Sequence, residues 1–250
     1  MSLQSFNPAT GEAGPTWERM SADEVMTIVG EAEAAFRSWR QLTLAERIPY
    51  FSRLAVVLRE NSERWAHLIT AEMGKTLTES RAEILKCAWL VEVYVDNAPA
   101  WLREEDVAAD GLSHKVVFQP LGIVFSIMPW NYPFWQALRF AVPGLMVGNT
   151  SLLKHASNVT GCAYAIEEAF RLAGFPPNVF RSLVPDYTTV EAWHLAQRRN
   201  LVSLDEVARA ECRSGGNCGN PVARTLINSG WTTDATRRLE IVAADGHQHQ

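Results

Sequence analysis

The chain has 250 residues, 47% of them hydrophobic and 20% charged, and a formal net charge of −5. This composition is typical of a soluble globular protein, and the acidic balance excludes the basic surface that binds nucleic acid. The polar N-terminus has no secretory segment, no apolar stretch is long enough to cross a bilayer, and the four cysteines have no framework spacing. We therefore expect a cytoplasmic protein with reduced thiols, whose partners include neither nucleic acid nor a membrane.

The first hundred residues predict turns and then helices. Breaker pairs such as Asn-Pro and Thr-Gly predict turns over residues 6–16. Ser21 with Glu24 and Thr43 with Glu46 match the pattern of a capping box, and apolar residues recur at helical spacing after each. We expect helices over 21–39, over 43–73 with a division at Asn61-Ser62 and a stop at Gly74, and over 78–98, where Pro99 ends the last one. No cluster of titratable residues on these helices points to chemistry.

Residues 116–154 predict a βαβ unit. The apolar run from Gly122 to Met128, bounded by prolines, is typical of a strand buried on both faces. After it come the turn Pro129-Trp130-Asn131-Tyr132-Pro133, an apolar helix ending near Gly144 or Gly148, and a second strand over 150–153. A helix over 159–173 and a strand over 179–184 continue the alternation, so we predict an α/β fold in which N-terminal helices precede a parallel sheet.

Asn131 and Lys154 each follow a predicted strand, where ligands of open α/β sheets bind. The prolines around Asn131 restrict its turn, which suits an amide donor aimed at developing negative charge; the alternative is an asparagine that hydrogen-bonds its own turn. Lys154 can hold a ribose hydroxyl or a phosphate, with the Ser157 hydroxyl nearby; the alternative is a solvated lysine, with Ser157 as a helix N-cap. The usual glycine-rich phosphate-binding motifs are absent.

Five segments carry a resemblance to a known family: FNPATGE, EMGKT, QPLGIVFSIMPWNYPFWQ, GNTSLLKHASN and AGFPPNVFRSLV. Together they resemble the N-terminal half of an aldehyde dehydrogenase, most closely the bacterial succinate-semialdehyde dehydrogenase branch, over about residues 5–193. The resemblance implies a partial cofactor-binding domain over residues 1–193, with an incomplete Rossmann-like parallel sheet. It leaves residues 194–250 as a divergent tail, for which disorder is one expectation.

The resemblance also implies roles for single residues. Asn131 would bind the substrate oxyanion, Lys154 would touch the adenine ribose, and the nicotinamide cofactor would be lined by Ile127, Met128, Pro129 and Trp130. Ser157 falls where NAD-preferring members often carry a glutamate, which would repel a 2′-phosphate, so the implied cofactor is NADP, or both NADP and NAD. The resemblance further implies a small aldehyde substrate and leaves a homo-oligomer open.

After Trp193 the family's T-G-S loop, E-L-G-G glutamate and G-Q-x-C cysteine are not recognisable. Cys218, in GGNCGNP, lies in a different setting and has no evident activating group. The spacing of Cys212, Cys218, His247 and His249 fits no standard zinc pattern, so we expect no metal. Residues 202–210 predict at most a short helix capped by Ser203.

These observations favour a truncated aldehyde dehydrogenase-like oxidoreductase that retains an oxyanion donor and part of a cofactor site. Without a recognisable nucleophile or base we expect no ordinary turnover. One alternative is a non-catalytic module that binds nucleotide or a partner protein. The other is the remnant of a disrupted gene, because a frameshift near Trp193 would explain the abrupt loss of pattern.

Overall fold

The computed structural model describes residues 2–108, 114–185, 208–212 and 239–243. It divides into two compact units, Met1–Leu102 with Gln119–Asp186 and Arg103–Phe118 with Tyr187–Gln250. The domain boundary predicted at residue 193 lies outside the described residues and stays a prediction. No helix in the described part of the chain is long and apolar enough to span a bilayer.

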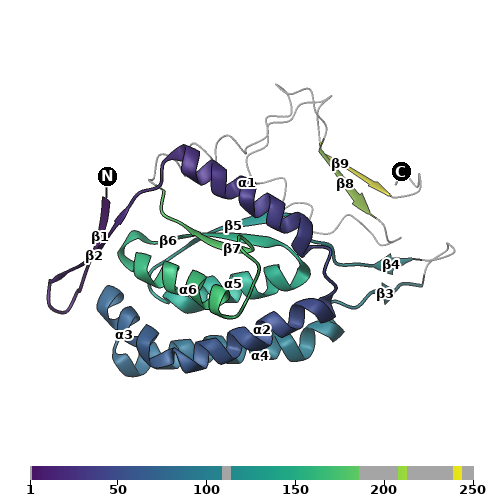
Figure 1. The fold of residues 1–250 in the computed structure, drawn as a ribbon. Coiled ribbons are helices and arrows are strands. Elements are labelled where there is room, and N and C mark those ends of the chain that lie inside the picture. Colours follow the sequence, from purple (N-terminus) through teal and green to yellow (C-terminus); the bar gives the residue numbers. More distant parts are fainter. Residues whose placement is uncertain (1, 109–113, 186–207, 213–238, 244–250) are drawn as a thin grey trace. The chain divides into compact units, whose positions relative to one another are not determined.

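The first unit is built on a three-stranded parallel sheet (Figure 1). Its strands lie in the order β5 (Ile123–Met128), β6 (Thr150–His155) and β7 (Phe180–Leu183). Two helices connect them on one face, α5 (Pro133–Val147) and α6 (Thr160–Leu172), and α1 (Ala22–Trp39) covers the other. The predicted α/β class with a parallel sheet is therefore confirmed.

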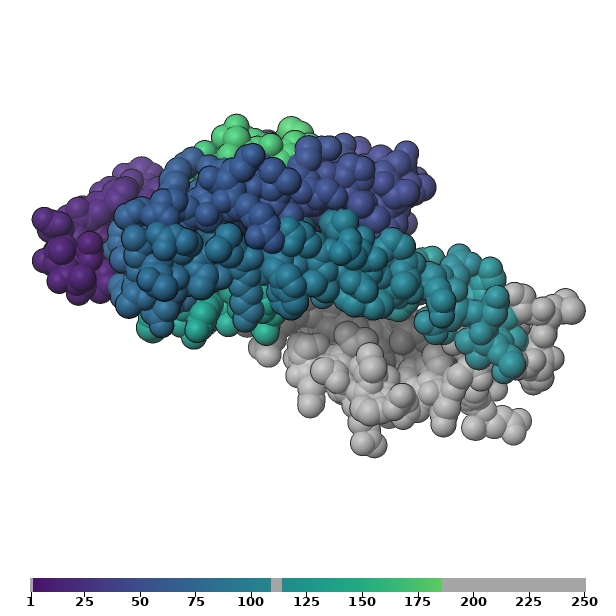
Figure 2. Space-filling view, turned by 90° about the horizontal axis from the view of Figure 1, so that it is seen from below, coloured from purple at the N-terminus to yellow at the C-terminus, as the bar shows by residue number. Residues whose placement is uncertain are grey.

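A further helical layer covers α5 and α6 on the side away from the sheet. It consists of α2 (Leu44–Glu60), α3 (Ser62–Met73) and α4 (Leu77–Trp101), which form much of the surface seen in Figure 2. A hairpin of β1 (Ser2–Phe6) and β2 (Ala13–Glu18) extends from one end of the unit. The main core lies between this layer, α5 and α6, whereas a smaller cluster joins α1 to the sheet through Val25, Ile28, Ala32, Leu152 and Leu183.

The helix boundaries follow local signals in the sequence. Both predicted capping boxes form, since the Ser21 hydroxyl accepts from the Glu24 N–H at 3.2 Å and the Thr43 hydroxyl from the Glu46 N–H at 3.3 Å. Asn61 separates α2 from α3 as predicted. Gly74, with a φ of 78°, ends α3 in the left-handed conformation that glycine adopts without strain.

Several predicted boundaries are wrong. Residues 13–16 belong to β2 rather than to a turn. Helix α4 passes Pro99 and ends at Trp101, because a proline in the last turn removes only one N–H. Ser157 does not cap α6: it opens the 3-10 turn η1 (Ser157–Val159), and its carbonyl accepts from the Thr160 hydroxyl at 2.9 Å.

Strand β5 is not buried on both faces, as its apolar run had predicted. The Ile127 side chain is 60% exposed, and only Ser126 of this strand is buried. The physical reason is that β5 is an outer strand of the three-stranded sheet in the described part of the chain. An apolar run does not by itself show that both faces of a strand are covered.

The described part of the second unit contains two small strand pairs. An antiparallel pair joins β3 (Glu105–Asp106) and β4 (Lys115–Val116), and a parallel pair joins β8 (Ala208–Cys212) and β9 (Leu239–Ala243). The helix predicted over 202–210 is wrong at its end, because residues 208–210 lie in β8. Its earlier residues, 202–207, are outside the described part.

Candidate functional site

Most of the residues predicted for the site gather where the three parallel strands end, here called the carboxyl edge (Met128, His155 and Leu183). Ile127 pairs with Lys154 and Met128 with His155 in the register of β5 and β6. The Ala156 N–H donates to the Met128 carbonyl at 3.1 Å, which ties the two strand ends together. The sheet therefore brings Lys154 beside the strand that leads into the Asn131 turn.

The predicted cofactor-lining residues are accessible at this edge. Pro129, Trp130 and Asn131 are exposed, as are Ile127 and Ser157, whereas Met128 is half-buried. Exposed apolar side chains beside an amide donor and a cation form a surface that suits a ligand with both a flat ring and polar groups. The roles of these residues remain predictions.

Lys154 is half-buried, and its surroundings disfavour its charge. Burial lowers the pKa of the Lys154 ammonium, and the positive charge of Arg19 lowers this pKa further. An anionic ligand at this position would favour the charged form again. The electrostatics of Lys154 therefore suit binding of an anion.

The turn that carries Asn131 is anchored by a buried carboxylate on α4. Glu83 Oε1 accepts from the N–H groups of Phe134 at 2.9 Å and Trp135 at 3.0 Å, the first free donors of α5. The same carboxylate forms an ion pair with Lys75, whose Nζ lies 3.6 Å from the centroid of the Tyr132 ring. The side chains of Glu83 and Lys75 are almost completely buried, so this ion pair holds the turn against the protein interior.

His155 anchors the same turn from the sheet. Its Nδ1 accepts from the Ala156 N–H at 2.9 Å, and its Nε2 lies 2.9 Å from the Pro133 carbonyl. Because Nδ1 is an acceptor, the proton is on Nε2, which donates to Pro133. Burial lowers the pKa of His155 to about 4, so the neutral ring links the end of β6 to the start of α5.

A second buried carboxylate holds the start of α6. Glu72 on α3 accepts from the N–H groups of Gly161 at 2.9 Å and Cys162 at 2.8 Å, and burial raises the pKa of this carboxyl. A Cβ at position 161 would lie 2.7 Å from Glu72 Oε1, so the close approach requires glycine. Glu72 and Glu83 thus set the two connecting helices against the sheet.

The buried cysteines of this unit are not activated. Burial raises the pKa values of Cys87 and Cys162 well above that of an ordinary thiol. A nucleophilic cysteine needs a lowered pKa, so neither thiol is suited to attack a carbonyl. Cys218, His247 and His249, which were considered as zinc ligands, lie outside the described residues. The described residues contain no group of side chains that could hold a metal ion.

Sequence reasoning missed Glu72, Lys75, Glu83 and His155, which hold the helices and the turn of the site in place. A signal was available: Glu83 lies at helical spacing with Ser80, Ile84 and Cys87, all buried. A carboxylate on an apolar helix stripe is almost never buried without partners.

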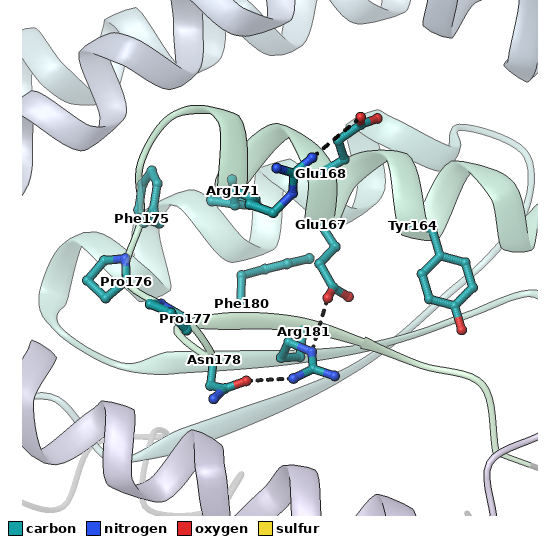
Figure 3. A pocket seen from close by; sticks show the side chains of 11 residues that line it. Tyr164, Glu167, Glu168, Arg171, Phe175, Pro176, Pro177, Asn178, Phe180 and Arg181 are labelled. Carbon is teal, nitrogen blue, oxygen red and sulfur yellow. Dashed lines mark hydrogen bonds and ion pairs between the residues drawn. The ribbon is translucent and has the colours of Figure 1, made fainter.

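A hollow of about 330 Å³ lies away from the carboxyl edge, at the start of β7 (Figure 3). Its charged groups are already paired: Arg181 contacts Glu167 at 3.0 Å and Asn178 at 2.6 Å, and Arg171 contacts Glu168 at 3.7 Å. Ligands of parallel sheets bind at the opposite ends of the strands. This hollow is therefore not the candidate site.

Comparison with known proteins decides the family. The model of the aldehyde dehydrogenase family matches residues 1–204. The chain belongs to the aldehyde dehydrogenase family. It is 43% identical to a probable succinate-semialdehyde dehydrogenase [NADP(+)] of Synechocystis over 184 residues, 74% of this chain and 40% of the relative. It is 34% identical to a succinate semialdehyde dehydrogenase [NAD(P)+] of Escherichia coli K12, over 98% of this chain and 54% of the relative.

Solved structures agree with this family membership. Succinic semialdehyde dehydrogenase from Streptococcus pyogenes, solved with NADP+ as the cofactor, matches with a TM-score of 0.76 and 26% identity, over 96% of this chain and 50% of that one. The chain thus spans about half the length of the family members it matches. The family match also extends past Trp193, so the predicted end of the resemblance at that residue is wrong.

Proposed function

We propose that the carboxyl edge of this chain binds a nicotinamide dinucleotide, as in NADP-dependent succinate-semialdehyde dehydrogenases. The strand register supports the proposal most directly, because it places Lys154 beside Ile127 and next to the turn of Asn131. The names of relatives support it too, since those in Synechocystis and E. coli are named for NADP(+) and NAD(P)+. The class of substrate implied by the same names is a semialdehyde.

Each residue at the edge has a distinct part in this proposal. Lys154 donates to the hydroxyls of the adenine ribose, while Ile127, Met128, Pro129 and Trp130 offer an apolar surface to the nicotinamide end. The exposed Asn131 amide donates to the oxygen of the reacting carbonyl, where negative charge develops. A bound nicotinamide supplies the acceptor for a hydride.

NADP is the preferred cofactor in this proposal, and NAD is the weaker ligand. Ser157 is exposed just beyond β6, and its hydroxyl can donate to a 2′-phosphate. A carboxylate at this position would instead repel the phosphate. Ser157 therefore favours NADP in this proposal without excluding NAD.

The chain is further proposed to lack ordinary aldehyde oxidation. Aldehyde attack requires a thiolate, but Cys87 and Cys162 are buried with raised pKa values. Cys218 lies in a segment unlike the family's cysteine motif. An oxyanion donor without a nucleophile stabilises a species that does not form. The remaining function is then nucleotide binding, alone or beside a partner chain.

Substitution of Lys154 with alanine should weaken NADP binding about tenfold or more, as expected for loss of a charged donor. Isothermal titration of the 250-residue chain with NADP measures this. Lys115→Ala is the matched control, because Lys115 is 47% exposed and lies in the other unit. Equal affinities of the Lys154→Ala variant and the unsubstituted chain would refute the proposed site.

Incubation of the chain with succinate semialdehyde and NADP should produce no more reduced cofactor than the Cys218→Ala variant does. The expected result follows from the absence of an activated thiol among the described residues. Turnover that Cys218→Ala abolishes would identify Cys218 as the nucleophile and refute the non-catalytic part of the proposal.

The gene-remnant alternative predicts a chain without a cooperative fold. One finding counts against a frameshift at Trp193: the alignment with the E. coli relative covers 98% of the chain and so continues beyond that residue. Circular dichroism of the purified chain tests the alternative directly, because a cooperative thermal transition excludes an unfolded remnant.

A further inference from the structure

Arg19 lies beside the carboxyl edge although it is far from Lys154 in sequence. It sits between β2 and α1, and the next residue, Met20, donates its N–H to the Val184 carbonyl at 2.9 Å. Met20 also forms a parallel bridge with Pro185, just after β7. Since Lys154 on β6 pairs with Leu183 on β7, Arg19 and Lys154 approach the same end of the sheet from different segments.

The Arg19 side chain has a donor that meets no acceptor in the described part of the chain. Its Nε is buried and has no hydrogen-bond partner among the described residues. A buried donor without an acceptor is costly, so each such group in a folded protein needs an explanation. The Nη groups of a guanidinium can donate to two oxygens of one phosphate.

The two cations affect each other. The positive charge of Arg19 is one of the causes that lower the pKa of Lys154, the larger cause being burial. Two positive groups held near one another repel unless an anion lies between them or beside them. This juxtaposition favours an anionic ligand at the carboxyl edge over a neutral one.

We propose that Arg19 is a specificity-determining residue that binds the 2′-phosphate of NADP together with Lys154. This inference rests on the proposed function, which puts the adenine ribose at Lys154. The phosphate within reach is then the one on the ribose 2′ oxygen, which NAD lacks. Arg19 accordingly adds affinity for NADP and none for NAD, whereas Lys154 contributes to both.

The test is titration of the full chain with NADP, NAD and adenosine 2′,5′-bisphosphate. Arg19→Gln should weaken NADP and the bisphosphate about tenfold or more and leave NAD within about twofold. Arg19→Lys, which keeps the charge, should retain a preference for NADP. Lys154→Ala should weaken both NADP and NAD, and NADP more strongly, because Lys154 also contacts the 2′-phosphate. Arg40→Gln is the control, because Arg40 follows the far end of α1 and should alter none of the three affinities.

Three outcomes would overturn the inference. Unchanged NADP affinity in Arg19→Gln, with NADP still bound at Lys154, refutes the role of Arg19 while the proposed function stands. An equal loss of NADP and NAD affinity in Arg19→Gln shows that Arg19 supports the fold or a part common to both nucleotides. If the unsubstituted chain binds neither nucleotide, the proposed function itself fails, and this inference fails with it.

Discussion

Replacement of Glu83 with alanine should lower the free energy of unfolding by about 3–5 kcal/mol, the range for breaking one side of a buried ion pair. The loss has two sources. The Lys75 ammonium, only 9% exposed, is left without its carboxylate. The N–H groups of Phe134 and Trp135 also lose their acceptor at the buried start of α5. Both costs fall on groups that water reaches poorly.

Urea unfolding of the chain, followed by tryptophan fluorescence, measures this effect. Glu33→Ala is the matched control, because Glu33 pairs with Arg37 on the surface, with side chains 55% and 74% exposed. Such exposed pairs contribute about 0–1 kcal/mol. Glu83→Gln should fall between the two, since it keeps an acceptor oxygen but loses the charge. If Glu83→Ala costs no more than Glu33→Ala, the pair does not stabilise the fold.

The same substitution connects stability to the proposed site. Glu83 holds the first two free N–H groups of α5, and the turn with Asn131 comes immediately before that helix. Lys75 contacts the ring of Tyr132 within the turn itself. Loss of the Glu83–Lys75 pair should therefore make the Asn131 turn more mobile. The proposed nicotinamide end of the site includes this turn and would become mobile with it.

The fold was predictable from sequence wherever a short-range signal determined it. The capping boxes at Ser21 and Thr43, the break at Asn61 and the stop at Gly74 each depend on residues within a few positions. The alternation of strands and helices from residue 122 onward was equally predictable, because parallel strands need a long connection, usually a helix. These local rules place Asn131 and Lys154 at strand ends without any knowledge of the tertiary structure.

The supports of the site were not predictable in the same way. Glu83 contacts residues 51 and 52 positions later, and Glu72 contacts residues 89 and 90 positions later. Arg19 and Lys154 are brought together only when the segment before α1 joins the edge of β7. Short-range patterns carry no information about such pairs. The exposure of Ile127 was missed for a related reason, because burial of a strand depends on what covers it.

Lowering the pH from 7 to 4 should destabilise the chain through His155. The pKa of this histidine is about 4 in the folded protein, below the ordinary value of 6.5, because burial disfavours the charged ring. Below pH 6.5 the unfolded chain therefore binds a proton that the folded chain does not. Stability that is fully present above pH 6.5 is lost as the pH falls toward 4, by about 3 kcal/mol in total.

The difference between the chain and its His155→Gln variant isolates this effect. Glutamine keeps a donor for the Pro133 carbonyl but does not titrate, so the stability advantage of the unsubstituted chain should shrink as the pH falls. The raised pKa of Glu72 acts in the opposite direction, because the folded state then holds a proton more readily, but this contribution is common to both proteins and cancels. If the free energies of unfolding of the chain and of His155→Gln change equally with pH, the ring is not held neutral. The link between β6 and α5 is then weaker than its geometry indicates.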